Sequence, residues 1–545
     1  MEHLDHRKKM TIMSAVIAAM LFAALNQTIV STALPRIVER LGGMEYYSWV
    51  FTVFMLTSSI TTILVGKLSD IYGRKPFILV GIGVFVLGSL LCGLSGDIIQ
   101  LIIYRGIQGL GAGMIMSTAF TVIGDLFAPR ERGRWQGTMS AAFGLASVFG
   151  PTLGGYIVDN MEWRWVFWVF LPFGIVAFVM IWALFPKVPR RQGETVDYAG
   201  SLLLALTMVP ALLAFSWAGT KYEWDSATII GLLLAAAVML GLFIAAERRA
   251  SSPVLPLGLF RNSIFTVSNT ASFLLGAGMF GAIMYMPWFV QGVMGTSATM
   301  SGYVTMPMTL SLVLGSAVGG AITTRTGKYK LLALAGVVIM MAGMYLLSTM
   351  GRGTSTFEAI VYMIVTGLGL GIAMPVFTLT VQNAVEQRLL GVATASSQLF
   401  RSLGGTIGVS VMSTVLANRL ASRMMEKGAA TGSAGLPKEL PPEAAKAFEA
   451  LRDPQALLDP GKLDKLREGL PADLQAVFAN LVETLRDALS YALTGVFFTG
   501  GVVMAGALLL TLFLKEIPLR SARKPNASEA APAPAGAGRR NAEQS

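Results

Sequence analysis

The side chains in this sequence best placed to do chemistry are ionisable groups beside long apolar runs. The densest set is Gly66-Lys67-Leu68-Ser69-Asp70-Ile71-Tyr72-Gly73-Arg74-Lys75. Asp70 can accept hydrogen bonds from the following cations or from the N-terminus of a neighbouring helix. Gly66 lets another helix approach closely, and Gly73 favours a tight or left-handed turn. We expect Arg74 and Lys75 to stay in water, as loop cations do beside a membrane.

Two arginines lie inside apolar runs rather than at their ends. Arg105 is about a third of the way into its run, and Arg401 is about 15 Å into another at 1.5 Å per helical residue. A charge at that depth costs at least a few kcal/mol unless it faces the protein interior and finds partners. For Arg105 the alternative is that its side chain snorkels to the outer surface.

Acidic residues are absent from the middle of the apolar runs. The nearest ones lie at run edges or in loops: Asp70, Asp97, Asp125, Asp159, Asp225 and Glu358. The two histidines, His3 and His6, both lie in the N-terminal tail. The sequence has no metal-ligand spacing and no phosphate-binding GxxxxGK[ST] loop. We therefore expect no enzyme, no cofactor and no metal site.

The elements that hold these side chains are predicted to be membrane-spanning helices. A composition of 54% hydrophobic and 13% charged residues, with a mean hydropathy of +0.63, excludes an ordinary soluble globule. A span needs about 20 apolar residues. Fourteen spans are expected, at about 10–34, 48–68, 77–96, 99–124, 134–158, 163–185, 197–218, 226–246, 264–291, 299–322, 331–350, 356–382, 390–417 and 490–514.

Lysines and arginines accumulate in alternate short loops, which predicts that both termini are cytoplasmic. The formal charge of +11 therefore reflects membrane topology rather than a nucleic-acid groove. The sole cysteine, Cys92, lies in an apolar run, so no disulfide framework is possible.

The chain also repeats itself. The stretch 320–330 follows the tenth predicted span as 66–75 follows the second, with Gly327 in the place of Gly73 and Thr324 in the place of Asp70. Six-span repeats are how many transporters are built. The predicted divisions are 1–9 (N-terminal tail), 10–190 (first six-helix bundle), 191–262 (two extra helices), 263–417 and 490–515 (second bundle), 418–489 (extracytoplasmic insert) and 516–545 (cytoplasmic tail).

Two regions fall outside the spans. In the insert, apolar residues recur every three or four positions in 444–451 and 474–489, which predicts short amphipathic helices. These helices form either a solvated connector or a lid over the outer mouth. The tail from Ser521 is rich in Ala, Pro and Gly and is expected to be disordered.

Several motifs in order resemble those of a known transporter family. The stretch 66–75 resembles the loop between spans 2 and 3 of the major facilitator superfamily, and 101–111 (LIIYRGIQGLG) matches its span 4. Span 5 resembles the superfamily's antiporter motif through Gly144, Gly150, Pro151, Gly154 and Gly155. Residues 25–35 (LNQTIVSTALP) are similar to span 1 of the fourteen-span drug:proton antiporters of the EmrB/QacA type. This resemblance implies an all-α fold of two six-helix bundles plus two helices, in the plasma membrane.

One departure concerns the coupling ion. The family's span-1 motif usually begins Leu-Asp, but position 26 here is Asn26, which cannot titrate. The coupling candidates are Asp70, Arg105, Asn26, Glu358 and Asp159. In the favoured hypothesis Asp70 or an outer-edge acid carries the proton, while Asn26 and Gln27 hydrogen-bond Arg105. In the other, this member has lost ordinary proton coupling or uses a substrate that responds to a cationic interior.

The resemblance implies a secondary active efflux transporter that works by alternating access, with protons, small amphiphilic substrates and membrane lipids as partners. We expect a monomer that binds no nucleic acid. The substrate-path candidates are Asn26, Gln27, Tyr285, Trp288, Gln291, Met306, Asn383, Gln398 and Arg401. An interior with two arginines and no acid favours neutral, zwitterionic or anionic amphiphiles. A lipid exporter of the same fold is the alternative.

Overall fold

The computed structural model describes residues 5–41, 47–186, 197–218, 222–251, 253–296, 298–431, 447, 451, 457 and 460–517. In these ranges the regular structure is helical, with no β-strand. The helices are α1 His6–Leu41, α2 Tyr47–Tyr72, α3 Arg74–Leu94, α4 Ile98–Leu126, α5 Pro129–Asn160, α6 Trp165–Trp168, α7 Leu171–Leu184, α8 Tyr198–Trp217, α9 Ala227–Arg249, η2 Leu257–Arg261, α10 Ser263–Trp288, η3 Phe289–Val293, α11 Ala298–Thr326, α12 Lys330–Ser348, α13 Thr356–Asn383, η4 Gln387–Leu389, α14 Leu390–Thr431, α16 Pro460–Glu468 and α17 Ala472–Leu512.

The predicted class, an all-α polytopic membrane protein, is confirmed. Within the described ranges 12 helices are long and apolar enough to cross a membrane. Two further predicted spans form α5, with 32 residues, and α8, with 20 residues. The apolar part of α8, Ala199–Phe215, is shorter than the other spans. The count of fourteen and the cytoplasmic placement of both termini remain predictions.

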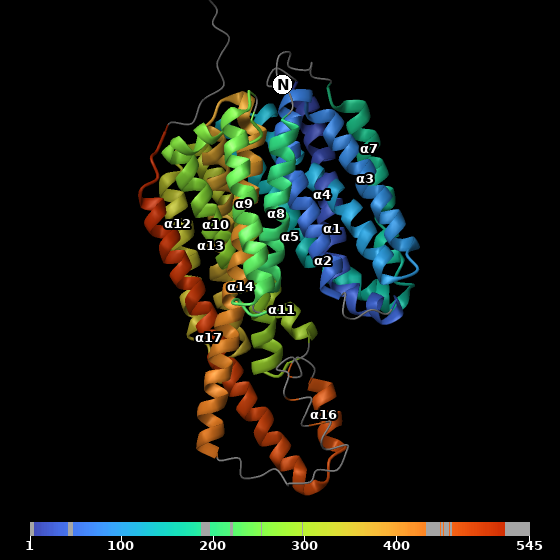
Figure 1. Cartoon of the computed structure of the whole chain (residues 1–545), viewed down its shortest axis with the longest axis vertical. Helices are drawn as coiled ribbons and strands as arrows, with labels where there is room; N and C mark the ends of the chain where they lie inside the picture. The colour runs from blue at the N-terminus through green and yellow to red at the C-terminus, as the bar shows by residue number, and fades with distance from the viewer. Residues whose placement is uncertain are drawn as a thin grey trace, which may run out of the picture.

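The helices form two halves, each with an apolar core of its own. One core contains buried side chains of α1, α3, α4 and α7, and the other contains side chains of α10 to α14 and α17. Figure 1 shows the two halves side by side, with the blue N-terminal helices on one side and α10, α12, α13 and α17 on the other. This arrangement agrees with the internal repeat in the sequence.

The extra pair α8–α9 lies over the seam between the halves. A smaller apolar cluster joins Ile63 of α2, Leu204 of α8, Val254 of the following linker, and Val392 and Leu399 of α14. In Figure 1, α8 and α9 stand in front of α14, between the two groups of helices. The pair therefore covers the line along which α2 meets α14.

Two close helix crossings between the halves lie at the end of the molecule that carries the N-terminus, the predicted cytoplasmic end. A Cβ atom on Gly66 of α2 would lie 2.6 Å from Cβ of Ala395 and 2.9 Å from the carbonyl oxygen of Gly391, both on α14. A Cβ on Gly133 of α5 would lie 3.2 Å from the carbonyl oxygen of Gly320 on α11. Glycine is needed at these crossings because any side chain would push the helices apart.

Two of the predicted spans are parts of longer helices, and the helix predicted over 474–489 is continuous with the last span. Helix α14 does not stop near 417 but has 42 residues, and α17 starts at Ala472 rather than near 490 and has 41. At 1.5 Å per residue each is about 60 Å long, whereas the bilayer core is about 30 Å thick. Figure 1 shows both helices projecting beyond the bundle, away from the N-terminus, next to α16.

The projecting part packs as an extension of the second half. Its buried side chains, among them Leu463, Leu474 and Phe478, belong to the same apolar cluster as the core of that half. Of the predicted helix at 444–451, only 447 and 451 are among the described residues, and the tail predicted to be disordered lies outside them from 518 onward.

Candidate functional site

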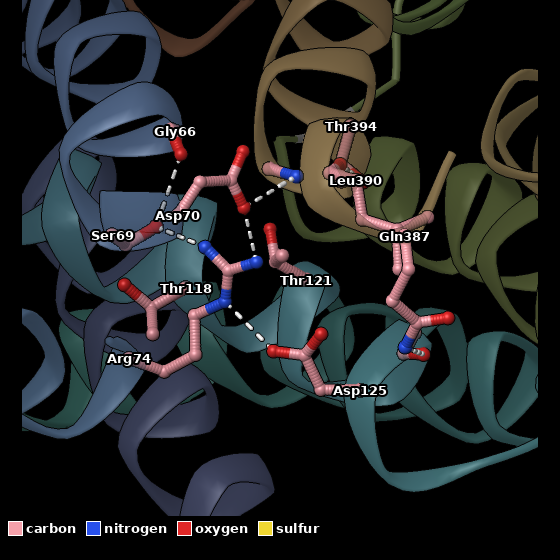
Figure 2. Close-up of polar contacts among 12 residues, drawn as sticks. Gly66, Ser69, Asp70, Arg74, Thr118, Thr121, Asp125, Gln387, Leu390 and Thr394 are labelled. Carbon is pink, nitrogen blue, oxygen red and sulfur yellow. Dashed lines mark hydrogen bonds and ion pairs between the residues drawn. The ribbon is translucent and has the colours of Figure 1, made fainter. Parts of the chain in front are cut away.

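The carboxylate of Asp70 joins the two halves of the molecule. It lies in the last turn of α2, where its side chain is buried, and accepts hydrogen bonds from the backbone N–H groups of Gly391 (3.1 Å) and Val392 (3.2 Å). These amides belong to the first turn of α14, where backbone N–H groups have no acceptor within the helix. An anion at a helix N-terminus is also favoured by the helix dipole. We call these contacts the Asp70 latch (Figure 2).

Arg74 completes the charge network behind the latch. Its guanidinium forms an ion pair with Asp70, donates to Ser69 Oγ (2.7 Å) and donates from Nε to Asp125 Oδ2 (2.8 Å). Figure 2 shows Arg74 between Asp70 and Asp125. The expectation that Arg74 stays in water is therefore wrong, since it is only 4% exposed. Gly73, with φ of 89°, turns the chain so that Arg74 starts α3 directly beneath α2.

Lys75, which was also expected to stay in water, forms hydrogen bonds within the protein. Its ammonium group donates to the carbonyl oxygens of Trp182 (2.7 Å) and Phe185 (2.5 Å), at the C-terminal end of α7. Lys330, after the repeated stretch, donates in the same way to the carbonyl oxygen of Leu512 (2.9 Å) near the end of α17. Each half thus ties its loop lysine to the last turn of its own final helix.

The repeated stretch 320–330 has a matching turn but different contacts. Gly327 has φ of 70°, as Gly73 has a positive φ, and Lys328 is exposed where Arg74 is buried. The buried Tyr329 donates its hydroxyl to the carbonyl oxygen of Lys515 (2.9 Å) and accepts from the N–H of Ile517 (2.8 Å). Burial raises the pKa of Tyr329. This second turn is thus held within its own half. The side chain of Thr324 lies outside the described residues.

Amide side chains add further bonds between the halves. Gln136 of α5 donates to Gln382 of α13 (3.1 Å), and Gln387 donates to the carbonyl oxygen of Gly124 on α4 (3.4 Å). The sequence did not predict that these residues and Asp125 belong to the site. The only signal available was a polar side chain close to the end of an apolar run. In this conformation the two halves are bonded together at the predicted cytoplasmic end.

Arg105 is fully buried, so the snorkelling alternative is wrong. Its Nη1 donates to Gln108 Oε1 (2.6 Å), its Nε to the carbonyl oxygen of Val50 (3.4 Å), and its guanidinium carbon lies 4.1 Å from the centre of the Phe54 ring. No carboxylate among the described residues pairs with Arg105. Its charge is stabilised by the dipoles of Gln108 and the Val50 carbonyl and by the face of the Phe54 ring.

Asn26 belongs to the same network through Gln108. Gln108 donates to Asn26 Oδ1 (3.0 Å) and Ser89 Oγ (2.8 Å), and Asn26 Nδ2 lies 3.3 Å from the same hydroxyl. With 0% exposure Asn26 is an interior member of this network in this conformation, and its role on the substrate path remains a prediction. Gln27 lies against Met55 Sδ (3.8 Å) and does not bond Arg105.

The other substrate-path candidates do not converge on one site. Tyr285, whose hydroxyl donates to the carbonyl oxygen of Val409 (3.3 Å), and Asn383 are buried in this conformation. Trp288, Gln291, Gln398 and Arg401 are partly exposed, and Met306 is exposed. Gln291 lies in η3, a π-helical turn that follows Pro287. Within the described part of the chain, the Arg401 guanidinium has no hydrogen-bond or ion-pair partner.

The glycines of the antiporter motif place α5 against two neighbours. A Cβ on Gly144 would clash with Val313 of α11, in the other half. A Cβ on Gly150 would clash with Thr28 of α1, and one on Gly154 would lie 2.7 Å from the carbonyl oxygen of Ile29. The side chains of Pro151 and Gly155 lie outside the described residues.

Glu358, one of the two outer-edge acids, forms its hydrogen bonds at the start of its own helix. Glu358 is exposed in the first turn of α13, where its carboxylate accepts from the N–H (2.7 Å) and hydroxyl (3.0 Å) of Ser355 in a capping box. It is thus a helix cap. The side chain of Asp159 lies outside the described residues. No group of three or more potential metal ligands occurs in the residues that the structure covers.

Comparisons with known proteins match most of the chain. A family model described as Major Facilitator Superfamily matches residues 16–409. "Multidrug transporter protein MdtP" of Bacillus subtilis (strain 168) is 37% identical over 527 residues, 96% of each chain. "Multidrug resistance protein 3" of the same strain is 32% identical over 500 residues, 92% of this chain and 94% of the relative. "Uncharacterized MFS-type transporter Rv1877" of Mycobacterium tuberculosis (strain ATCC 25618 / H37Rv) is 36% identical over 508 residues, 93% of this chain and 70% of the relative.

Two solved structures have the same fold. The human organic anion transporter MFSD10 (TETRAN) aligns with a TM-score of 0.60 at 14% identity, over 92% of this chain and 99% of that one. The proton:xylose symporter XylE aligns with a TM-score of 0.58 at 14% identity, over 94% and 97%.

Proposed function

Because this chain belongs to the Major Facilitator Superfamily, we propose that it exports hydrophobic and amphiphilic compounds by alternating access, in antiport with protons. Like its relatives, it is a multi-pass plasma-membrane transporter of the drug-efflux type. It is not an enzyme. The observation that carries the mechanism is the Asp70 latch, in which one carboxylate of the first half holds two backbone amides of the second.

The latch supports a rocking mechanism because it joins rigid halves by contacts that can be broken together. The charged contacts of the latch lie near one end of the seam, and each half has an apolar core of its own, so separating the halves there leaves both cores intact. The free amides of α14 and the Asp70 carboxylate would then be exposed to water. Substrate enters from the cytoplasm in that second state and leaves outward in the one described here.

Proton coupling is tested with purified protein in liposomes. A pH gradient should drive accumulation of a fluorescent amphiphile, and dissipation of the gradient with a protonophore should abolish it. Accumulation that is the same with and without the gradient would refute antiport. Retention of full gradient-driven transport by Asp70→Asn would remove that residue from the proton pathway, although its effect on the latch would remain.

For the substrate class, we propose neutral, zwitterionic or anionic amphiphiles rather than organic cations. The support is Arg401, a partly exposed cation on α14 without a partner in the described chain. Arg401→Gln should reduce efflux of anionic compounds by about tenfold, the worth of one partly desolvated charge contact of about 1.4 kcal/mol, and spare neutral ones. Arg401→Lys is the matched control and should retain most of the anion efflux.

The substrate profile is measured as accumulation in an efflux-deficient host, over cationic, neutral and anionic compounds. Equal export of all three classes, or export of cations alone, would contradict the proposed role of Arg401. A fluorescent phospholipid in the same series distinguishes drug efflux from lipid export by the same fold.

A further inference from the structure

A second buried charge cluster lies beside the latch and has no place in the mechanism given so far. It consists of Lys67 on α2, Asp197 immediately before α8 and Glu247 in the last turn of α9. Lys67 is 9% exposed and Glu247 is 4% exposed. The cluster therefore connects the extra helix pair to α2, one residue from Gly66 and three from Asp70.

The two carboxylates lie on either side of one point, next to Gly200. A Cβ atom on Gly200 would touch both, clashing with Asp197 Oδ2 and lying 2.8 Å from Glu247 Oε1. One oxygen of each group is bonded: Asp197 Oδ1 accepts from the N–H of Gly200 (2.7 Å), and Glu247 Oε1 accepts from the N–H of Val254 (3.1 Å).

The second oxygen of each carboxylate is buried without a partner. Asp197 Oδ2 and Glu247 Oε2 have no hydrogen-bond donor among the described residues. A buried charged oxygen without a donor costs free energy that a single proton would recover, because a protonated carboxyl donates to its neighbour. Two adjacent carboxylates that share one proton are a stable arrangement, since both cannot easily be ionised at close range.

The charge balance leads to the same conclusion. Among the described residues, the charged groups of the cluster are the two carboxylates and one ammonium, that of Lys67, whose charge acts on Glu247. Arg248 and Arg249 on α9 are exposed to solvent. Fully ionised, the cluster carries one net negative charge in a buried place, and with one proton it is neutral.

The helix ends select the carboxylate that is protonated. Asp197 is the N-cap of α8, where the helix dipole stabilises a negative charge. Glu247 is in the last turn of α9, where the dipole disfavours a negative charge. By comparison, Asp70 accepts two amides and pairs with Arg74, so its anion is fully bonded.

From this geometry we propose that the Asp197–Glu247 pair is the site at which the transporter binds its coupling proton, with the proton held on Glu247. This inference rests on the proposed proton antiport. It assigns to Glu247 the proton-carrying role that Asn26, in the place of the family's span-1 aspartate, cannot perform. When ionised, Glu247 accepts from the linker amide of Val254 and attracts Lys67, which together fasten the linker to α2. Protonation removes that charge, so it weakens the contact between this linker and α2.

Infrared difference spectroscopy of the full-length protein tests the site without transport. A carboxyl C=O band should appear as the pH is lowered, disappear in Glu247→Gln and persist in Glu131→Gln, an exposed acid in the first turn of α5. In Asp197→Asn the band should appear at a pH lower by about one unit, because a neighbouring negative charge is gone. A band that survives unchanged in Glu247→Gln would overturn the proposal.

Transport supplies the second readout. Glu247→Gln keeps an oxygen for the Val254 amide, so we expect it to fold and to exchange substrate across liposomes without a gradient at a rate within about twofold of wild type. Its accumulation driven by a pH gradient should fall by about tenfold or more. Gradient-driven accumulation equal to wild type would overturn the proposal. If the wild type itself shows no gradient-driven transport, the proposed proton antiport is refuted. The infrared band then still tests whether Glu247 binds a proton.

Discussion

Replacing Asp70 by asparagine should open the seam between the halves at the predicted cytoplasmic end. Asp70 accepts two backbone amides of α14 across the seam, and a hydrogen bond to a charged group contributes about 1.5–3 kcal/mol. An asparagine keeps one acceptor oxygen and one neutral bond of about 1 kcal/mol. The closed state should therefore lose about 2–5 kcal/mol relative to the open one, a change of at least about 30-fold in their ratio.

The ratio is measured from spin-label distances between Arg134→Cys on α5 and Lys328→Cys after α11, which are exposed, lie at the same end and belong to different halves. The matched control is Asp97→Asn, an N-cap of α4 whose carboxylate accepts an N–H within its own half (2.8 Å). The control should leave the distances unchanged. An unchanged closed population in Asp70→Asn would refute the latch.

Three further predictions concern packing and buried polar groups, each checked by thermal unfolding in detergent or by hydrogen exchange. Gly404→Ala should destabilise the protein by about 1–3 kcal/mol, because its Cβ would clash with α10; Gly302→Ala, with open space around it, should be neutral or stabilising by up to about 1 kcal/mol. Gln108→Ala should cost about 1.5–3 kcal/mol, since it removes a charged hydrogen bond from the buried Arg105, and no loss of melting temperature would contradict this. Tyr329→Phe should speed amide exchange after α17 by about tenfold, the loss of one bond of about 1.4 kcal/mol; unchanged exchange would show that this bond is dispensable.

The fold was largely predictable because its determinants are local in sequence. Long apolar runs give helices, and loop cations distinguish their ends. The extension of α14 was missed because the predicted span ended with its apolar run, although residues 418–427 are mostly good helix formers, with no glycine before Gly428 and no proline. At α17 the helix over 474–489 was predicted, but not its continuity with the last span. A polar helix outside the bilayer therefore continues an apolar one without a stop signal.

The site was predictable only in part, since sequence spacing does not show which distant residues meet. The motif around Asp70 identified the place, and Gly73 has the predicted positive φ. The burial of Arg74 depends on Asp125, which is 51 positions away. In the same way, the sequence does not show that Asn26 contacts Gln108 and Ser89 from two other helices.

The central claim is that transport requires the two halves to separate along the seam between α2 and α14. Ser59 and Ser402 face each other across it, with hydroxyl oxygens 3.4 Å apart, so the double variant Ser59→Cys/Ser402→Cys can form a disulfide with little change of shape. Substrate efflux from vesicles that contain this variant should stop on oxidation and return on reduction, while each single variant is unaffected. Efflux that continues at the wild-type rate in fully cross-linked protein would contradict the account.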